Sequence, residues 1–282
     1  MSNPSQHSQN FLRDPRLVAA LLAKTNIGKD DVVYDIGAGK GIISAVLAGV
    51  CRKVVSVEAD PALVQKLRAN TAQQANVTIV PADFLTLNLP AAPYKVFANI
   101  PFDQSAAILH KLTDTARAPS SCYLIAQKEF AQKLTVNSSA RVSQLAIKLA
   151  VRFETRILSP ISAEAFYPRP RVRIVLLDVE QRREPLVAAA DQQLFYDFVT
   201  YVFNATNPSL QVTLAPLIPS AQLAEQLQIT APTKPSQLPA DKWTMLFRLL
   251  LQKRRELVRL VGGYEARLAA KHAGHTKLHR TR

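Results

Sequence analysis

Hydrophobic positions along the first part of the chain alternate between short apolar runs and segments with helical spacing. The apolar runs predict strands at 32–36, 54–57, 77–80, 94–98 and 122–126. The segments between them predict helices at about 42–50, at 61–73 and from the turn after 101 to about 112. Strands that alternate with helices indicate βαβ units and therefore a parallel sheet.

Further elements flank this pattern. Asp14 is suited to cap a helix and Pro15 to occupy its first position, so we expect a helix that runs to about residue 24. After the last apolar run we expect a helix that begins at 127–131, a second helix at 143–149, and strands at 153–158 and 172–179. The segment 166–171 contains two prolines and predicts a stiff loop, because each proline fixes its own φ and restrains the preceding residue.

The composition changes near Arg182, and this predicts a domain boundary. From Leu186 onward only helical patterns remain, joined by proline-rich turns, at about 189–204, 220–227 and 239–260. We therefore expect an α/β domain over 1–182, with a Rossmann-like sheet. A smaller all-α domain should follow over 183–262, and then a basic, flexible tail over 263–282.

Charge points to the class of partner. The formal net charge is +14 and the isoelectric point is about 10.0. A surplus of this size favours a polyanionic partner, nucleic acid above all, although a merely solvated basic surface is the alternative. No apolar run reaches membrane-spanning length, the N-terminus lacks a secretory pattern, and both cysteines, Cys51 and Cys122, lie in apolar segments. These features predict a cytoplasmic protein with no membrane contact and buried thiols.

The C-terminal tail is strongly basic and also carries histidines. Metal binding is one reading of His272, His275 and His279, but no cysteine or carboxylate cluster accompanies them, so we expect no metal. A flexible arm for RNA is the favoured interpretation of its cations, which are Arg267, Lys271, Lys277, Arg280 and Arg282.

A glycine-rich turn follows the first predicted sheet strand. Gly37, Gly39 and Gly41 allow the backbone to turn sharply and to approach a ligand that a Cβ would exclude. A P-loop would need Ser or Thr after Lys40, and a dinucleotide fingerprint would need the wider G-x-G-x-x-G spacing. The shorter spacing is typical of enzymes that use S-adenosylmethionine.

Carboxylates follow the next two strands. Glu58 ends the second strand and is suited to accept hydrogen bonds from both ribose hydroxyls, a device that NAD enzymes share. Asp83 follows the third strand and is suited to accept from the amino group of the cofactor's adenine; its alternative is a helix cap or turn residue. Ligands of parallel sheets bind beyond the carboxyl ends of the strands, where Gly37, Glu58, Asp83 and Asn99 all fall.

The segment Asn99, Ile100, Pro101 and Phe102 indicates the chemistry. Hydrogen bonds from an adenine amino group to the Asn99 side-chain oxygen and to the Ile100 carbonyl would aim the nitrogen lone pair at a methyl group on sulfur. Catalysis would then rest on positioning and preorganised dipoles. Phe102 would stack on the base, and Phe166 is a candidate for a second aromatic face. The alternatives are an ordinary Asn-Pro turn at Asn99 and core packing at Phe166.

Five motifs in order resemble the rRNA adenine N6-methyltransferases, and within them the Erm type that confers macrolide–lincosamide–streptogramin B resistance. They lie at 7–12, 35–41, 99–102, 127–131 and 166–172. The resemblance implies a class I methyltransferase sheet, S-adenosylmethionine as methyl donor, and one adenine of 23S rRNA as the site of mono- or dimethylation. It also implies an enzyme that binds RNA through a basic surface, and we expect it to act as a monomer.

Carried over by motif, the resemblance assigns site residues. It places the target base between Phe102 and Phe166. Contacts with the cofactor fall on Gln9, Asn10, Leu12, Gly37, Gly39, Glu58, Asp83 and Asn99.

Departures from the family pattern and a sister family leave alternatives open. The family usually has Tyr where Phe102 stands, and Asp103, Gln104 and Ser105 replace a more usual Asn-Ile-Ser. The KsgA-type enzymes, which dimethylate adjacent adenines of 16S rRNA, share most of these motifs. Two features favour the Erm type. They are the segment 7–10 and the sequence Asn-Ile-Pro, where the KsgA-type enzymes usually have Asn-Leu-Pro-Tyr. A non-catalytic nucleic-acid-binding protein on the same fold is a further alternative, and a nicotinamide-dependent oxidoreductase is the most distant one.

Overall fold

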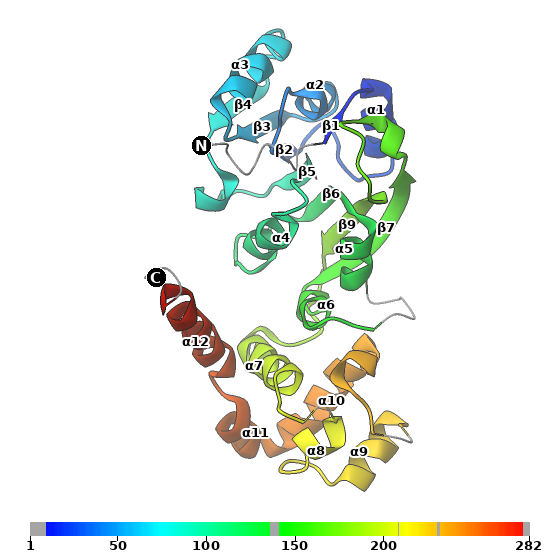
Figure 1. The fold of residues 1–282 in the computed structure, drawn as a ribbon, viewed down its shortest axis with the longest axis vertical. Coiled ribbons are helices and arrows are strands. Elements are labelled where there is room, and N and C mark those ends of the chain that lie inside the picture. The colour runs from blue at the N-terminus through cyan, green and yellow to red at the C-terminus, as the bar shows by residue number, and fades with distance from the viewer. Residues whose placement is uncertain (1–9, 136–140, 208, 230–231, 279–282) are drawn as a thin grey trace. The chain divides into compact units, whose positions relative to one another are not determined.

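Two compact units make up the chain (Figure 1). The structure is a computed structural model, and it describes residues 10–135, 141–207, 209–229 and 232–278. Unit 1 consists of residues 1–132 and 154–181, and unit 2 consists of residues 133–153 and 182–282. None of the described helices is long and apolar enough to cross a membrane.

A seven-stranded sheet with the order β4-β3-β2-β5-β6-β9-β7 forms the centre of unit 1. Neighbouring strands from β4 to β6 pair in parallel, and β9 pairs antiparallel with β6. This confirms the predicted parallel sheet. In chain order the strands are β2 (Val32–Ile36), β3 (Lys53–Glu58), β4 (Val77–Pro81), β5 (Lys95–Asn99), β6 (Ser121–Gln127), β7 (Phe153–Ile161) and β9 (Ile174–Gln181).

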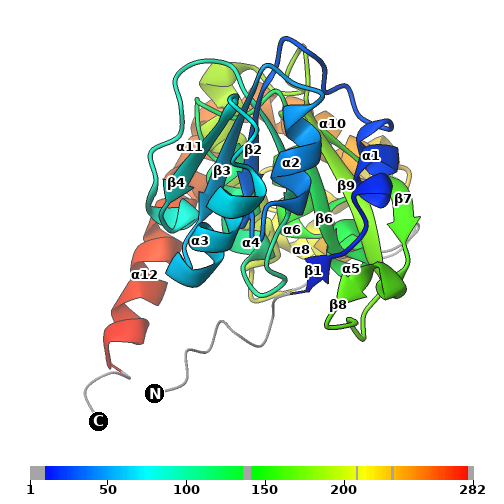
Figure 2. The same ribbon diagram turned by 90° about the horizontal axis from the view of Figure 1, so that it is seen from above.

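Helices follow the strands at the predicted places. Figure 2 shows α1, α2 and α3 on the near side of the sheet. For α2 and α3 this is expected, because right-handed crossovers that succeed one another in the same direction place their helices on the same face. Asp14 and Asp60 each cap a helix by accepting a backbone N–H two residues on, and a proline takes the first position in both. The helices of this unit are α1 (Pro15–Leu22), α2 (Ile42–Ala48), α3 (Pro61–Asn70), α4 (Ser105–Thr113) and α5 (Lys128–Leu134), the last of which crosses into unit 2.

A second, two-stranded sheet was not predicted. β1 (Phe11–Leu12) pairs antiparallel with β8 (Phe166–Tyr167), so a segment expected to be a loop begins as a strand. Two-residue strands leave no periodic signal in a sequence, and only the long-range pairing defines them. The pairing fixes the N-terminal segment against the chain between β7 and β9.

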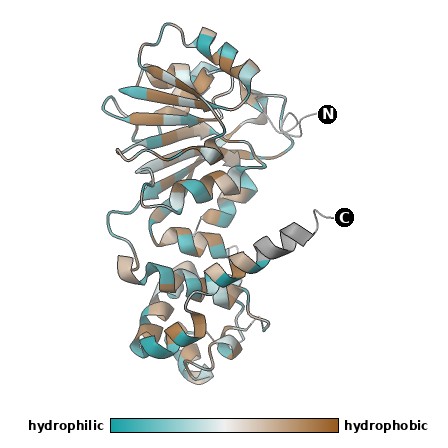
Figure 3. Cartoon of the chain, turned by 90° about the vertical axis from the view of Figure 1, so that its left-hand side faces the viewer, coloured by the Kyte–Doolittle hydropathy of each residue, from teal (hydrophilic) through white to brown (hydrophobic). Residues whose placement is uncertain are grey.

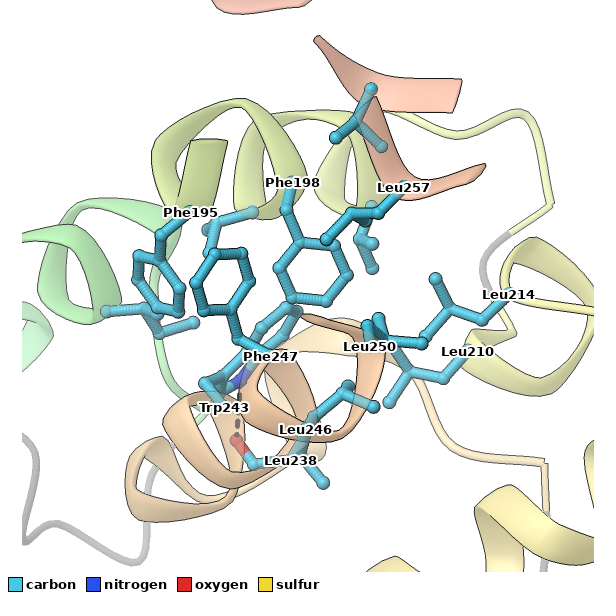
Figure 4. Close-up of a cluster of buried hydrophobic side chains, with 14 of the residues drawn as sticks. Phe195, Phe198, Leu210, Leu214, Leu238, Trp243, Leu246, Phe247, Leu250 and Leu257 are labelled. Carbon is cyan, nitrogen blue, oxygen red and sulfur yellow. Dashed lines mark hydrogen bonds between the residues drawn. The ribbon is translucent and has the colours of Figure 1, made fainter. Parts of the chain in front are cut away.

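Unit 2 is all-α, as predicted. Figure 3 shows hydrophobic and hydrophilic residues mixed along the described helices. Its core is aromatic: the Phe195 ring lies edge-on to the Phe247 ring at 5.1 Å, and Trp243 donates its indole N–H to the Leu238 carbonyl at 3.3 Å (Figure 4). The helices are α6 (Gln144–Ala150), α7 (Gln192–Phe203), α8 (Leu210–Thr213), α9 (Ser220–Leu227), α10 (Ala240–Leu250), α11 (Arg254–Val261) and α12 (Tyr264–Leu278).

Residues 133–153 belong to unit 2, although the sequence placed them within a first domain that ended at 182. α6 buries Ala146 and Ile147 in the core of unit 2, and the Gln144 amide donates to the Thr200 hydroxyl of α7 at 3.1 Å. The spacing of apolar residues predicts a helix here. It does not say which core the apolar face joins.

The tail expected to be flexible is helical as far as Leu278, and residues 279–282 lie outside the described part of the chain. The carboxylate of Asp197 on α7 accepts the backbone N–H groups of Gly263 and Glu265 at 2.8 and 2.9 Å. The Tyr264 ring packs edge-on against the Tyr201 ring at 5.3 Å. These contacts cap α12 from another helix, which no local sequence signal could show.

Candidate functional site

A cavity of about 470 Å³ opens at the carboxyl ends of β2, β3, β4 and β5 in unit 1. This is where ligands of parallel α/β sheets bind. The wall contains most of the residues that the sequence assigned to a site: Asn10, Gly37, Gly39, Glu58, Asp83, Asn99, Ile100, Pro101 and Phe102. One cavity thus brings together most of the residues assigned to the cofactor with Phe102, one of the two residues assigned to the target base.

The glycine turn between β2 and α2 adopts a conformation that requires glycine. Gly39 has a φ of +58°, and a Cβ there would lie 3.1 Å from the Phe11 ring. Gly41 has a φ of +87°, and a Cβ there would lie 2.6 Å from Leu67 Cδ1. L side chains rarely adopt such φ values, and both positions are also crowded. The turn therefore lies closely between Phe11 on one side and α3 on the other.

Glu58, at the end of β3, is held from two sides. One carboxylate oxygen accepts the Gly39 N–H at 2.8 Å and the other accepts the Asp60 N–H at 2.9 Å, and only 6% of the residue is exposed. Each carboxylate oxygen has a second lone pair. The two backbone bonds thus orient the carboxylate and leave acceptor capacity on the cavity side for a diol.

Asp83 follows β4 and caps a short helical turn, which was the alternative predicted for it. Its Oδ1 accepts the Leu85 N–H at 2.9 Å and caps the short 3-10 turn η2 (Phe84–Thr86). The residue nevertheless lines the cavity, beside the buried Phe84. Capping does not exclude a ligand contact, because the second carboxylate oxygen makes no part of the cap.

Asn99, at the end of β5, is fixed through one end of its amide. Its Nδ2 donates to the carbonyl of Asn10 at 2.6 Å. With the nitrogen directed at Asn10, the oxygen Oδ1 becomes the acceptor end of the amide, as a bound amino group requires. The turn that follows is closed by the Gln104 N–H, which donates to the Pro101 carbonyl at 3.1 Å. Phe102 is half-buried and lines the cavity.

Asp35 lies buried beneath the glycine turn, and no role was predicted for it from the sequence. Its Oδ2 accepts from the Ser44 hydroxyl at 2.7 Å, and Ser44 and Ser56 share a hydrogen bond at 2.7 Å. Its Oδ1 is buried without a partner. Burial raises the pKa of Asp35 to about 7, the Ser44 bond opposes this, and the nearby Glu58 adds to it. Asp35 does not line the cavity.

Two of the assigned residues, Leu12 and Phe166, do not line the cavity. Leu12 and Phe166 face each other across the β1–β8 pair and point into the core, with Phe166 only 2% exposed. The second aromatic face that the sequence placed at Phe166 is therefore not on the cavity wall, because pairing with β1 turns this side chain inward. Gln9 lies outside the described residues.

Several residues to which the sequence assigned no role also line the cavity. They include Phe11, Phe84 and Gln104. Phe11 and Phe84 each adjoin an assigned polar residue, and that adjacency was the available signal. Gln104 stands where the resembled family usually has an apolar residue, so its place on the wall became visible only in the structure.

The donor set of this cavity fits S-adenosylmethionine. A glycine turn that a Cβ would obstruct admits a close backbone approach, Glu58 offers acceptors for two ribose hydroxyls, and Asp83 offers an acceptor for an adenine amino group. The described residues contain no group of three or more His, Cys, Asp or Glu side chains suited to hold a metal ion.

Comparison with known proteins places the chain in a family. A family model described as ribosomal RNA adenine dimethylase matches residues 2–252. An rRNA methyltransferase of Streptomyces thermotolerans is 32% identical over 252 residues, which cover 86% of this chain and 82% of that protein. The ribosomal RNA small subunit methyltransferase A of Acaryochloris marina is 28% identical, with 85% of this chain and 94% of that protein covered.

The fold and the motif resemblance agree with this match. The crystal structure of the 23S rRNA methyltransferase ErmE superimposes with a TM-score of 0.78 at 26% sequence identity, over 86% of this chain and 99% of that one. This confirms the Rossmann-like methyltransferase fold and the resemblance to Erm-type enzymes. The chain therefore belongs to the ribosomal RNA adenine dimethylase family, and it is an S-adenosylmethionine-dependent rRNA adenine N6-methyltransferase.

Proposed function

We propose that the chain methylates N6 of one specific adenine in 23S rRNA and thereby confers resistance to macrolide, lincosamide and streptogramin B antibiotics. The observation that carries the proposal is the fixed amide of Asn99, which lies in one cavity with Glu58 and Phe102. The likeness to a 23S rRNA methyltransferase over nearly the whole of that structure supports the choice of the large-subunit RNA.

The residues of the cavity divide into two groups. Glu58 and Asp83 bind the cofactor's adenosine through its ribose hydroxyls and its amino group, and the glycine turn lets the ligand approach the backbone. When bound, S-adenosylmethionine supplies an electrophilic methyl group on sulfur. The second group acts on the target adenine. Asn10 belongs to both groups, because it lines the cavity and its backbone carbonyl orients Asn99.

Asn99 and Phe102 act on the target adenine. The Asn99 Oδ1 and the Ile100 carbonyl accept the two N–H bonds of the amino group, which frees the nitrogen lone pair to face the methyl group. Phe102 stacks on the base, an interaction worth about 1–3 kcal/mol. The acceptors are already oriented before the substrate arrives, so little reorganisation is needed during the reaction. No general base of shifted pKa is required, since the amino proton becomes acidic once the nitrogen is methylated.

The RNA partner follows from charge and from the position of the cavity. The net charge of +14 favours a polyanion. An adenine must leave its stack to enter a cavity at the edge of the sheet, so the substrate presents it unpaired or flipped. The described lining residues of the cavity all come from unit 1, so one copy of the chain suffices to form the site, and this supports action as a monomer. An rRNA substrate supports action in the cytoplasm.

The decisive experiment uses tritiated S-adenosylmethionine with protein-free 23S and 16S rRNA, followed by mapping of the labelled base. Label on a single 23S adenine supports the proposal, and expression in a macrolide-sensitive host should then raise the inhibitory concentration of erythromycin. Failure to label 23S rRNA in any form overturns it.

A second candidate is dimethylation of adjacent adenines in 16S rRNA. It is favoured by the 28% identity to a small-subunit methyltransferase over 94% of that protein's length. Label on paired 16S adenines that appears only with small-subunit particles would establish this function. Tight RNA binding without label on either RNA would instead indicate a non-catalytic nucleic-acid-binding protein.

A further inference from the structure

The β1–β8 pair has one buried face and one outer face (Figure 2 shows the two strands side by side). Leu12 lies opposite Phe166, and both side chains enter the core of unit 1. Phe11 lies opposite Tyr167, so these two side chains share the other face. Arg13 follows Phe11 by two positions and therefore projects on that same face.

Tyr167 and Arg13 form a stacked pair on this outer face. The Arg13 guanidinium carbon lies 4.4 Å from the centroid of the Tyr167 ring. The backbone N–H of Arg13 donates to the Ala165 carbonyl at 3.1 Å. Tyr167 is 60% exposed, and it is the only aromatic residue among the exposed large hydrophobic side chains of the described chain. Within the described residues, no ion pair neutralises Arg13.

This pair continues the wall of the cavity. Phe11, the cross-strand neighbour of Tyr167, lines the cavity and packs against Gly39 of the glycine turn. The Lys40 ammonium lies 5.4 Å from the centroid of the Phe11 ring. The surface beside the cavity thus presents two aromatic rings, each with a cation near it.

The chemistry of such a surface suits an unpaired nucleotide. An exposed ring with an arginine above it offers a flat apolar face to a base and a positive charge to the adjoining phosphate. A folded protein gains little from a large aromatic ring left in water, whereas an RNA-binding surface gains a stacking site. A target adenine that enters the cavity draws its neighbouring nucleotides past this face.

We propose that Tyr167 and Arg13 form a stacking platform for an unpaired nucleotide that flanks the target adenine. This proposal rests on the proposed function, in that the occupant is part of the RNA substrate. The Tyr167 ring stacks on the flanking base, and Arg13 holds the ring in place and faces the phosphate. Tyr167 touches substrate only, so it acts on RNA recognition and not on methyl transfer itself.

The first test measures stacking without any reaction. The probe is a single-stranded adenine hexamer RNA with 2-aminopurine in place of one adenine, whose fluorescence is quenched when the base stacks. Wild type and Tyr167→Phe should quench the probe, while Tyr167→Ala should bind it about tenfold more weakly with little quenching. Equal quenching by Tyr167→Ala would overturn the platform. This result does not depend on whether 23S or 16S rRNA is the substrate.

The second test uses whichever rRNA the wild-type protein labels. Tyr167→Ala should raise KM for that RNA about tenfold with kcat nearly unchanged, and Tyr167→Phe should restore the wild-type KM. The melting temperature and the Kd for S-adenosylmethionine serve as controls and should stay at the wild-type values, because the ring is exposed. If the wild type methylates the RNA and Tyr167→Ala has the same KM as wild type, the platform is overturned and the proposed function is left intact.

A double-mutant cycle separates a joint platform from two independent contacts. Arg13→Ala should also weaken probe binding, and the double variant should lose less than the product of the two single losses, because the second substitution removes a partner that is already gone. Strictly multiplicative losses would show that Arg13 does not support Tyr167.

Discussion

The side-chain amide of Asn99 combines two tasks at its two ends. The nitrogen donates to the Asn10 carbonyl at 2.6 Å, and this bond determines where the oxygen points. The residue therefore acts through the N-terminal segment as well as through its own position on β5. A residue of this kind cannot be replaced by one that keeps only half of its hydrogen bonding.

We expect Asn99→Ala to lower kcat roughly 100-fold, the usual cost of losing a preorganised polar group at the reacting atom. RNA affinity should stay within about twofold of wild type, since the substitution leaves the basic surface intact. Asn99→Asp is the informative companion, because it keeps the acceptor but loses the donor to Asn10 and should also be impaired. Single-turnover methylation rates measure both, and wild-type rates in Asn99→Ala would contradict the proposed mechanism.

Buried Asp35 predicts a pH dependence of stability. Its folded-state pKa of about 7 lies above its ordinary value of 3.8. Between these values the folded state retains a proton that the unfolded state has released, so the free energy of unfolding contributed by Asp35 falls as pH rises from about 4 to 7 and is level above that.

Asp35→Asn mimics the neutral carboxyl and should remove this contribution. The variant should gain stability relative to wild type as pH rises from 5 to 8, by at most about 3 kcal/mol. Urea unfolding of both proteins at pH 5, 6, 7 and 8 measures the difference. A constant difference across this range would show that Asp35 has the same pKa in both states.

At the scale of elements, α12 depends on a residue far away in the sequence. Asp197 is only 3% exposed, and its carboxylate accepts two N–H groups at the start of α12. Glu265 in the first turn contacts Lys148 and Gln193, and the Arg267 guanidinium donates to the Gly262 carbonyl at 2.6 Å. These contacts bind the start of the helix to α6, to α7 and to the end of α11.

Asp197→Ala should release α12, because two helix-terminal N–H groups lose their acceptor at a cost of about 1–2 kcal/mol. Hydrogen exchange should accelerate at residues 264–271, while the core helices α7 and α10 keep their protection. Asp197→Asn retains one acceptor oxygen and should show a smaller change. Exchange rates in α12 that match wild type would mean that Tyr264 and Glu265 hold the helix without the cap.

The charge of the whole molecule governs its affinity for RNA. Five Lys and Arg residues follow Gly263 in the sequence, and each phosphate that such a residue neutralises steepens the salt dependence of binding. Because contacts anchor the first turns of α12 to the rest of unit 2, the positions of Arg267 and Lys271 along this helix are fixed.

Removal of residues 264–282 should weaken rRNA binding and reduce the slope of log K against log salt concentration by up to about 3.5. Filter binding at 50 to 300 mM KCl measures this. A full-length variant with Arg267→Gln and Lys271→Gln separates charge from the loss of the helix and should show part of the same reduction. An unaltered slope in the truncated protein would mean that α12 and the residues after it make no phosphate contact.

Sequence alone determined most of the elements and most of the cavity. Apolar periodicity located the strands of the parallel sheet, because buried strands must be apolar on both faces. Parallel strands also bring their carboxyl ends to one edge, so the sequence predicts that Gly37, Glu58 and Asn99 lie near one another. The glycine turn could also be predicted from the sequence, since almost no other residue adopts its backbone conformation.

Only the tertiary structure decided how distant segments meet. The β1–β8 pairing turned Phe166 into the core and Tyr167 outward, and two-residue strands carry no pattern from which this could be predicted. The cap of α12 by Asp197 and the assignment of residues 133–153 to unit 2 have the same origin. Local sequence specifies which face of an element is apolar, but the partner of that face is chosen by packing among segments that are far apart in the chain.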